Sequence, residues 1–269
     1  MILTVSHISR YHYDQPVRAV VQSHRLTPSR HDGQRVIDWA VEVTDSLPGG
    51  AYRDGAGDWV QGYTVLGPIS DISVSVHGTV EVEDTAGVLR GHRETVSPEI
   101  YLRSTGSTDA DVALSDLSAA AMGTASGLDA AHRLAAAVAD AIAYRPGATH
   151  AHTTAAEALA LGEGVCQDHT HALIAVARVA GMPARYVSGY LFSDAAGGAH
   201  EAAHAWAEVF VEGLGWVGFD PANRCCPDER YIRLGSGFDA QDAAPIRGIA
   251  RGAGVESLDV SVTIGAAQQ

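Results

Sequence analysis

Residues 164–191 read GVCQDHTHALIAVARVAGMPARYVSGYL, and this stretch decides the fold of the chain. A glycine-flanked turn leads into Cys166, and the apolar residues after it recur at the spacing of one helix face. Gly181 ends this helix and Pro183 prevents its return, while residues 185–192 favour a strand. We therefore predict a helix that begins at Cys166 and packs on a sheet.

Farther on, the chain reads HAWAEVFVEGLGWVGFDP from His204 onward. Residues 203–211 and 215–220 favour two strands joined by a short turn. An antiparallel hairpin centred on Glu212 pairs His204 with Asp220, and a shift of one residue leaves the two diagonal but on the same face. The spacing therefore predicts an imidazole beside a carboxylate.

These two stretches together supply the parts of a catalytic triad. A lone cysteine is more often a buried structural residue, and a His–Asp pair is common on surfaces. A cysteine in the first turn of a helix, however, gains the thiolate form that attacks carbonyl groups. We predict Cys166 as nucleophile, His204 as base within about 4 Å of its sulfur, and Asp220 as the group that orients the base.

Acyl transfer also requires an oxyanion hole. The backbone N–H of Cys166 is the natural first donor, and Tyr144, Gln167 and Trp206 are equal candidates for the second. Asp168 stands where its carboxylate can cap the helix.

The same stretches resemble the core of the bacterial transglutaminase-like superfamily, whose fold is related to papain-type cysteine proteases. The G-x-C, H-A-W and F-D-P segments carry the likeness, which implies the same roles for Cys166, His204 and Asp220 and covers residues 144–220. The segments HISRYHYDQPV and RLTPSRHDGQ resemble the β-rich region that precedes this core in one bacterial subfamily. Departures from the family pattern are His169, where an aromatic such as Phe is expected, and residues 234–239.

The rest of the chain predicts an α+β protein. Residues 1–83 favour short strands, such as 2–8 and 36–43, and Ile72, Val74 and Val76 alternate with polar neighbours. We expect residues 1–108 to form a β-sandwich followed by a linker from residue 84. We expect residues 109–269 to form the papain-like catalytic core and a C-terminal tail, with helices over 109–143 and a helix start at Thr154.

Histidine pairs near Cys166 raise the alternative of a zinc site. They are His150 and His152, His169 and His171, and His200 and His204. His169 and His171 diverge by about 200° around a helix axis, so they cannot easily share one ion. We predict no metal and no other cofactor.

The composition excludes several classes of protein. Apolar residues make up 46% of the chain, the net charge is -14, and all 18 basic residues are arginine. Such an acidic protein is a poor candidate for binding nucleic acid or anionic membranes. We interpret the neighbouring residues Arg224, Arg230 and Arg233 as part of a solvated face. The three cysteines do not form a disulfide framework. With no signal peptide or membrane span evident, we expect a cytoplasmic protein.

We therefore predict a cysteine-dependent hydrolase of peptide or isopeptide amide bonds, with a peptide or protein as its substrate. One alternative is a protein-glutamine acyltransferase, which uses the same acyl-enzyme but an amine acceptor. Another is a non-catalytic binding or scaffold module, although such a module would be expected to lack Cys166, His204 or Asp220. The sequence does not indicate an oligomeric state.

Overall fold

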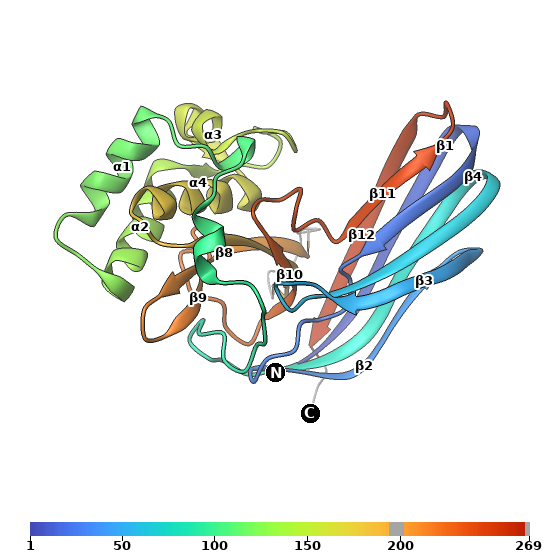
Figure 1. Cartoon of the computed structure of the whole chain (residues 1–269), viewed down its shortest axis with the longest axis horizontal. Helices are drawn as coiled ribbons and strands as arrows, with labels where there is room; N and C mark the ends of the chain where they lie inside the picture. The colour runs from blue at the N-terminus through green and yellow to red at the C-terminus, as the bar shows by residue number, and fades with distance from the viewer. Residues whose placement is uncertain (194–201, 267–269) are drawn as a thin grey trace.

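A six-stranded antiparallel sheet forms one lobe of the protein (Figure 1). The computed structural model describes residues 1–193 and 202–266. The first four strands are β1 (Ile2–His24), β2 (Gln34–Val43), β3 (Ser46–Arg53) and β4 (Trp59–Val82). β1 and β4 are 23 and 24 residues long and pair with each other over most of that length. β2 and β3 pair with successive parts of β4.

This sheet encloses an apolar core of its own. The register of β1 on β4 shifts in the middle of the strands, yet Tyr11 and Val20, from opposite halves of β1, belong to one buried cluster. Ile72, Val74 and Val76 are buried in the same cluster, which confirms the predicted alternation. Because hydrogen bonds join all six strands into one sheet, the expected β-sandwich is not confirmed.

The last two strands return to the N-terminal sheet. β11 (Ile246–Arg251) and β12 (Glu256–Ala266) both pair with β1. We expected residues 109–269 to form the catalytic core and a C-terminal tail. The structure instead places β11 and β12 in the N-terminal sheet. Pairing between strands more than 200 residues apart leaves no signal in the local pattern of residue types.

The second lobe combines helices with a four-stranded antiparallel sheet in the order β10-β7-β8-β9. Its helices are α1 (Val112–Met122), α2 (Gly127–Ala141), α3 (Ala155–Leu161) and α4 (Cys166–Val179). Its strands are β7 (Ala184–Leu191), β8 (Ala203–Val211), β9 (Gly215–Phe219) and β10 (Tyr231–Gly237). The two-residue strands β5 (Ala143–Tyr144) and β6 (Glu163–Gly164) form a separate parallel pair. The side chain of Thr154 caps α3 as predicted.

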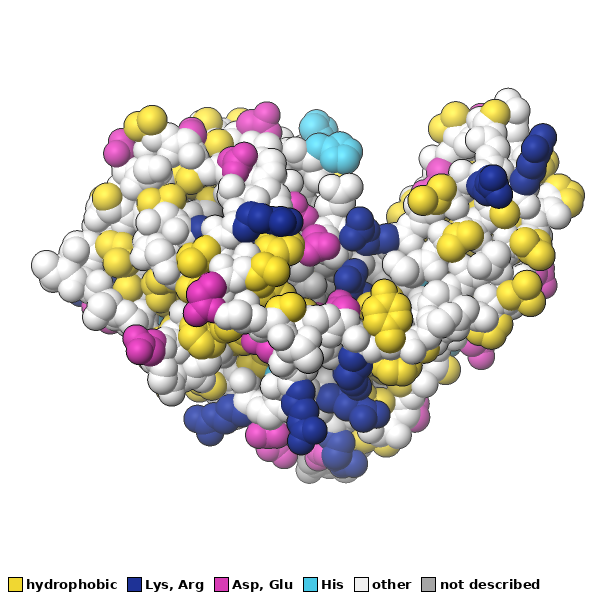
Figure 2. All heavy atoms as spheres, viewed as in Figure 1, with side chains coloured by type: hydrophobic (Ala, Val, Ile, Leu, Met, Phe, Trp, Pro, Cys, Tyr) yellow, Lys and Arg dark blue, Asp and Glu magenta, His cyan; other side chains and the backbone are white. Residues whose placement is uncertain are grey.

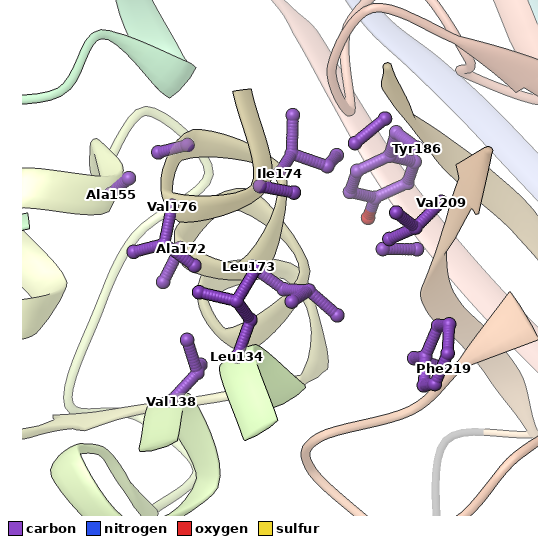
Figure 3. Close-up of a cluster of buried hydrophobic side chains, with 14 of the residues drawn as sticks. Leu134, Val138, Ala155, Ala172, Leu173, Ile174, Val176, Tyr186, Val209 and Phe219 are labelled. Carbon is purple, nitrogen blue, oxygen red and sulfur yellow. The ribbon is translucent and has the colours of Figure 1, made fainter. Parts of the chain in front are cut away.

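Helix α4 lies at the centre of this lobe (Figure 3). Leu173 and Ile174 are fully buried, with Leu134 of α2 on one side of the helix and Tyr186 and Val209 of the sheet on the other. Every α4 residue from position 168 to 178 is buried. A helix enclosed on all sides cannot rotate or slide without losing this packing, so the residue at its N-terminus is fixed in space.

The segment expected to be a linker packs against the second lobe. Val88 forms a bridge with Val217 of β9, and the carboxylate of Glu94 accepts hydrogen bonds from Trp216 and Arg185. Tyr101 is buried, and its carbonyl accepts from the guanidinium of Arg178. These contacts make residues 84–104 part of the folded lobe.

A buried ionic cluster joins the two lobes. Arg233 of β10 contacts Asp58, which precedes β4, at 2.7 Å and Glu208 of β8 at 2.8 Å. Arg185 of β7 contacts Glu208 at 2.7 Å and Glu94 at 2.6 Å. The interpretation of Arg233 as a solvated residue is wrong, because its side chain is only 4% exposed. Its charge has two carboxylate partners, which is what burial of an ion requires.

The outer surface carries interspersed charges. On the face shown in Figure 2, basic side chains gather toward the bottom with acidic side chains among them, and a notch separates the two lobes at the top. Arg224 and Arg230 pair with Asp140 and Asp228. Among residues 1–193 and 202–266, no helix has the length and apolar content needed to cross a membrane.

Replacing Arg233 by Ala should destabilise the protein by about 3–5 kcal/mol, because Asp58 and Glu208 would remain buried without their partner. Chemical denaturation at pH 7 measures this loss. Arg10→Ala is the control: its pair with Asp259 is exposed, and its loss should cost less than about 1 kcal/mol. Equal effects of the two substitutions would contradict a role for the cluster in joining the lobes.

The ionic cluster should also make stability depend on pH. The pKa of Glu208 is lowered, because two arginines outweigh the effect of its burial, and the pKa of Asp58 is lowered by Arg233 in the same way. The stability that these two carboxylates contribute is present above about pH 4, the ordinary pKa of carboxyl groups in an unfolded chain. It is lost as the pH falls through their lower pKa values in the folded protein.

Candidate active site

Cys166 is the first residue of α4 and follows β6 after a single residue, Val165. The carboxylate of Asp168 accepts the N–H of Val165 at 2.8 Å and the hydroxyl of Thr149 at 2.6 Å, as expected for a capping group. A Cβ at Gly164 would lie 2.7 Å from Cβ of Asp168, so only glycine permits this tight turn. The thiol therefore lies at the positive end of the helix dipole.

The β8–β9 hairpin brings His204 and Asp220 together. Its register pairs Ala207 with Phe219, so the turn is centred on Gly213, one residue beyond the expected position. This one-residue shift leaves His204 and Asp220 diagonal to each other on the same face of the hairpin, as predicted from their spacing. Nε2 of His204 lies 2.6 Å from Oδ2 of Asp220.

The imidazole of His204 lies between the thiol and the carboxylate. Because Nε2 faces Asp220, Nδ1 is the ring nitrogen left for Cys166. Burial alone would lower the pKa of His204. The hydrogen bonds and negative charges of Asp220 and Cys166 outweigh burial and raise the pKa to about 10. This raised pKa favours the imidazolium form of His204.

Asp220 has two further partners that sequence reasoning missed. Asn223 donates its side-chain N–H to Oδ2 at 2.7 Å and its backbone N–H to Oδ1 at 3.1 Å. The hydroxyl of Tyr231 donates to Oδ2 at 2.8 Å. Burial alone would raise the pKa of Asp220, but these donors and His204 lower it. The short spacing between Asp220 and Asn223 is typical of a turn and could have indicated their contact. No local sequence pattern indicates that Tyr231 contacts Asp220.

The candidates for the second oxyanion donor differ in their surroundings. The side-chain N–H of Gln167 donates to the carbonyl of Ala151, and Trp206 is buried in a cluster with Tyr231. Tyr144 is 51% exposed and pairs with Gly164 across β5 and β6, close to the start of α4.

His169 and His171 serve as structural groups. The ring nitrogens of His169 lie 2.9 Å from the carbonyl oxygens of Val165 and Ile142, so this ring ties the start of α4 to the chain before β5. His171 accepts the N–H of Ala240. In the described part of the chain, no three His, Cys, Asp or Glu side chains are grouped to bind a metal. His200 and the glycines 197–198 lie outside the described residues.

A cavity of about 220 Å³ borders the triad. Ala135 and Ala139 of α2, Cys225, Cys226 and Asp220 are among its lining residues. Neither Cys225 nor Cys226 is disulfide-bonded. Burial raises the pKa of both thiols, so a smaller fraction of each is present as thiolate at neutral pH than in an unburied cysteine.

Comparison with known proteins identifies the family of the chain. The sequence model of the Transglutaminase-like superfamily matches residues 116–221, and that of the Bacterial transglutaminase-like N-terminal region matches residues 3–81. The chain is 32% identical over 280 residues to an uncharacterised protein of Mycobacterium leprae, with 97% of this chain and 98% of that protein covered. The chain belongs to the transglutaminase-like superfamily.

Two further proteins show local and structural likeness to this chain. An uncharacterised protein of Mycobacterium tuberculosis is 41% identical over 101 residues, which are 34% of this chain and 32% of that protein. The crystal structure of a proposed cysteine protease from Cytophaga hutchinsonii gives a TM-score of 0.76 at 21% identity and covers 100% of this chain and 91% of that one. At this identity the likeness shows the shared fold.

The three thiols should differ in reactivity. At pH 7, iodoacetamide should label Cys166 well before Cys225 and Cys226, because the imidazolium of His204 and the helix N-terminus favour the thiolate. Replacing His204 by Gln should slow the labelling of Cys166 alone. Mass spectrometry of the digested protein measures each site, and equal rates at all three cysteines would contradict an activated thiol.

The imidazole of His204 should stay protonated through neutral pH. With a pKa raised to about 10, above the ~6.5 of an unfolded histidine, its contribution to stability is complete below about pH 6.5. That contribution is lost as the pH rises through about 10. An NMR titration of the ring measures the pKa directly, and Asp220→Asn should lower it. A midpoint below pH 7 in the unmodified protein would contradict the ion pair.

Proposed function

We propose that this protein is a cysteine-dependent hydrolase of peptide or isopeptide amide bonds. The observation that carries the proposal is the imidazole of His204, which contacts the carboxylate of Asp220 at 2.6 Å and whose pKa is raised by that carboxylate and by Cys166. Nucleophilic catalysis needs a nucleophile, a base within reach of it and a group that orients the base. The substrate class follows from the superfamily and from this chemistry.

The first half of the reaction forms an acyl-enzyme. The thiolate of Cys166 attacks the carbonyl carbon, a C–S bond forms, and the carbonyl electron pair moves onto oxygen. The N–H of Cys166, which has no helical acceptor at this position, is placed to stabilise that oxygen. As the tetrahedral intermediate collapses, the C–N bond breaks and the imidazolium of His204 gives its proton to the departing amine. A thioester and a neutral imidazole remain.

The second half releases the acid. His204 removes a proton from water while the water oxygen attacks the thioester carbon. Collapse of this second intermediate breaks the C–S bond, and the thiolate and imidazolium are restored. Asp220 remains ionised throughout and stabilises the imidazolium through its 2.6 Å contact with Nε2.

Two further assignments belong to the same proposal. The N-terminal sheet shapes or restricts the substrate-binding cleft, because it packs beside the catalytic lobe and supplies no member of the triad. The cytoplasm is the proposed compartment, since the three cysteines are unpaired and structural disulfides are rare in a reducing environment. The proposed partner is a peptide or protein substrate.

Water should be the preferred acceptor of the acyl group. Transfer to an amine requires a binding path that admits the amine and excludes water, which is present at about 55 M. With a cleavable amide substrate and millimolar primary amine, mass spectrometry should show the free acid as the main product. Replacing Cys166 by Ala should abolish both the acid and the amine adduct.

An excess of amine adduct at modest amine concentration would instead support the acyltransferase alternative, with the same three residues in the same roles. A folded protein whose Cys166 never forms an acyl-enzyme with any amide or thioester substrate would support the non-catalytic module.

A further inference from the structure

One oxygen of the Asp220 carboxylate accepts three hydrogen bonds. Oδ2 lies 2.6 Å from Nε2 of His204, 2.7 Å from Nδ2 of Asn223 and 2.8 Å from Oη of Tyr231. The carboxylate is fully buried, so water does not supply these contacts. His204 is the partner used in the proposed reaction, and Asn223 is only three residues away in the chain. Tyr231 comes from another strand and therefore needs a separate explanation.

The phenol of Tyr231 is held firmly where it meets Asp220. Tyr231 begins β10, at the opposite edge of the sheet from β9, which Asp220 follows. Its ring packs edge-on against Trp206, with centroids 5.5 Å apart, and lies 5.9 Å from the ring of His204. Residue Tyr231 is only 4% exposed. A side chain packed this closely cannot easily change rotamer. A rigid donor fixes the position of the oxygen that it contacts.

We propose that Tyr231 is a positioning residue of the triad, whose hydroxyl holds Oδ2 of Asp220 against Nε2 of His204. The terminal torsion of an aspartate has a broad energy profile, so contacts rather than intrinsic preference decide which oxygen faces the imidazole. Tyr231 and Asn223 converge on the same oxygen as His204 and exclude a rotated carboxylate. Asp220 can then orient the ring so that Nδ1 remains directed at Cys166.

Among residues 1–193 and 202–266, the hydroxyl of Tyr231 has one strong acceptor, the carboxylate of Asp220. Besides Asp220, the oxygen lies 3.3 Å from Sγ of Cys225, and a thiol is a weak partner compared with a carboxylate. The pKa of Tyr231 is raised by its burial and by the charge of Asp220. The phenol therefore stays protonated and donates a hydrogen bond to Oδ2 of Asp220.

The test compares two buried tyrosines. Tyr231→Phe removes the hydroxyl that contacts Asp220. Tyr190→Phe is the matched control, because Tyr190 is also buried and its hydroxyl lies 2.7 Å from Nδ1 of His7, outside the triad. Labelling of Cys166 by iodoacetamide is followed from pH 5 to 9 by mass spectrometry, and thermal unfolding confirms that both variants fold.

In Tyr231→Phe, the midpoint of the labelling curve of Cys166 should move upward by about one pH unit, which corresponds to labelling on the order of tenfold slower at pH values below that midpoint. A loosened Asp220 stabilises the imidazolium less well, and the thiolate becomes less populated. The turnover of an amide substrate should fall by a similar factor with little change in KM. Tyr190→Phe should leave the labelling curve of Cys166 where it is.

The inference rests on the proposed function, but the labelling readout does not require turnover. An unchanged labelling curve in a folded Tyr231→Phe protein would overturn the positioning role, whatever the enzyme hydrolyses. Equal shifts in both variants would also overturn it and indicate a general loss of packing. If the shift occurs only in Tyr231→Phe while no amide is cleaved by the unmodified protein, the positioning role stands and the hydrolase proposal fails.

Discussion

The burial of α4 is the constraint on which the rest of the structure depends. The helix is enclosed by α1, α2, α3 and the sheet, and the alanines along it, such as Ala172 and Ala175, let these elements approach closely. Because the helix begins at Cys166, its packing fixes the thiol relative to β8 and β9. The backbone donors of the first helical turn then lie beside the thiol, where the proposed reaction would form its oxyanion. The position of the nucleophile is thus a consequence of packing that occurs well away from it.

One face of β8 carries both the catalytic base and the junction between the lobes. His204, Trp206 and Glu208 alternate along the strand and point to the same side. His204 meets Asp220, while Glu208 meets Arg185 and Arg233 in the ionic cluster that reaches Asp58 of the N-terminal lobe. Trp206 separates the two groups. A shift of β8 would disturb the triad and the junction together, so the N-terminal lobe contributes to holding the base in place.

The triad could be predicted because its geometry follows from local rules. Strand parity placed His204 and Asp220 on one face even though the turn was centred one residue away from the expected position. The start of α4 followed from glycines and from the helical spacing of apolar residues. The same reasoning could not find Tyr231 or the partners of β11 and β12, since these depend on which strands pair across long separations. It also misjudged Arg233, because only the tertiary structure shows that two carboxylates surround it.

The way the lobes are connected decides how the N-terminal sheet must be studied. A fragment beginning at residue 109 would keep β11 and β12 but lack β1, the strand with which both pair. Their unpaired edges would favour aggregation. The same fragment would leave Arg185 and Arg233 without Glu94 and Asp58, and uncompensated buried charge is strongly destabilising. Poor activity of such a fragment would therefore report on folding and not on substrate binding. The contribution of the sheet to the cleft has to be measured in the intact chain, through substitutions of exposed side chains that leave β1, β11, β12 and the ionic cluster in place.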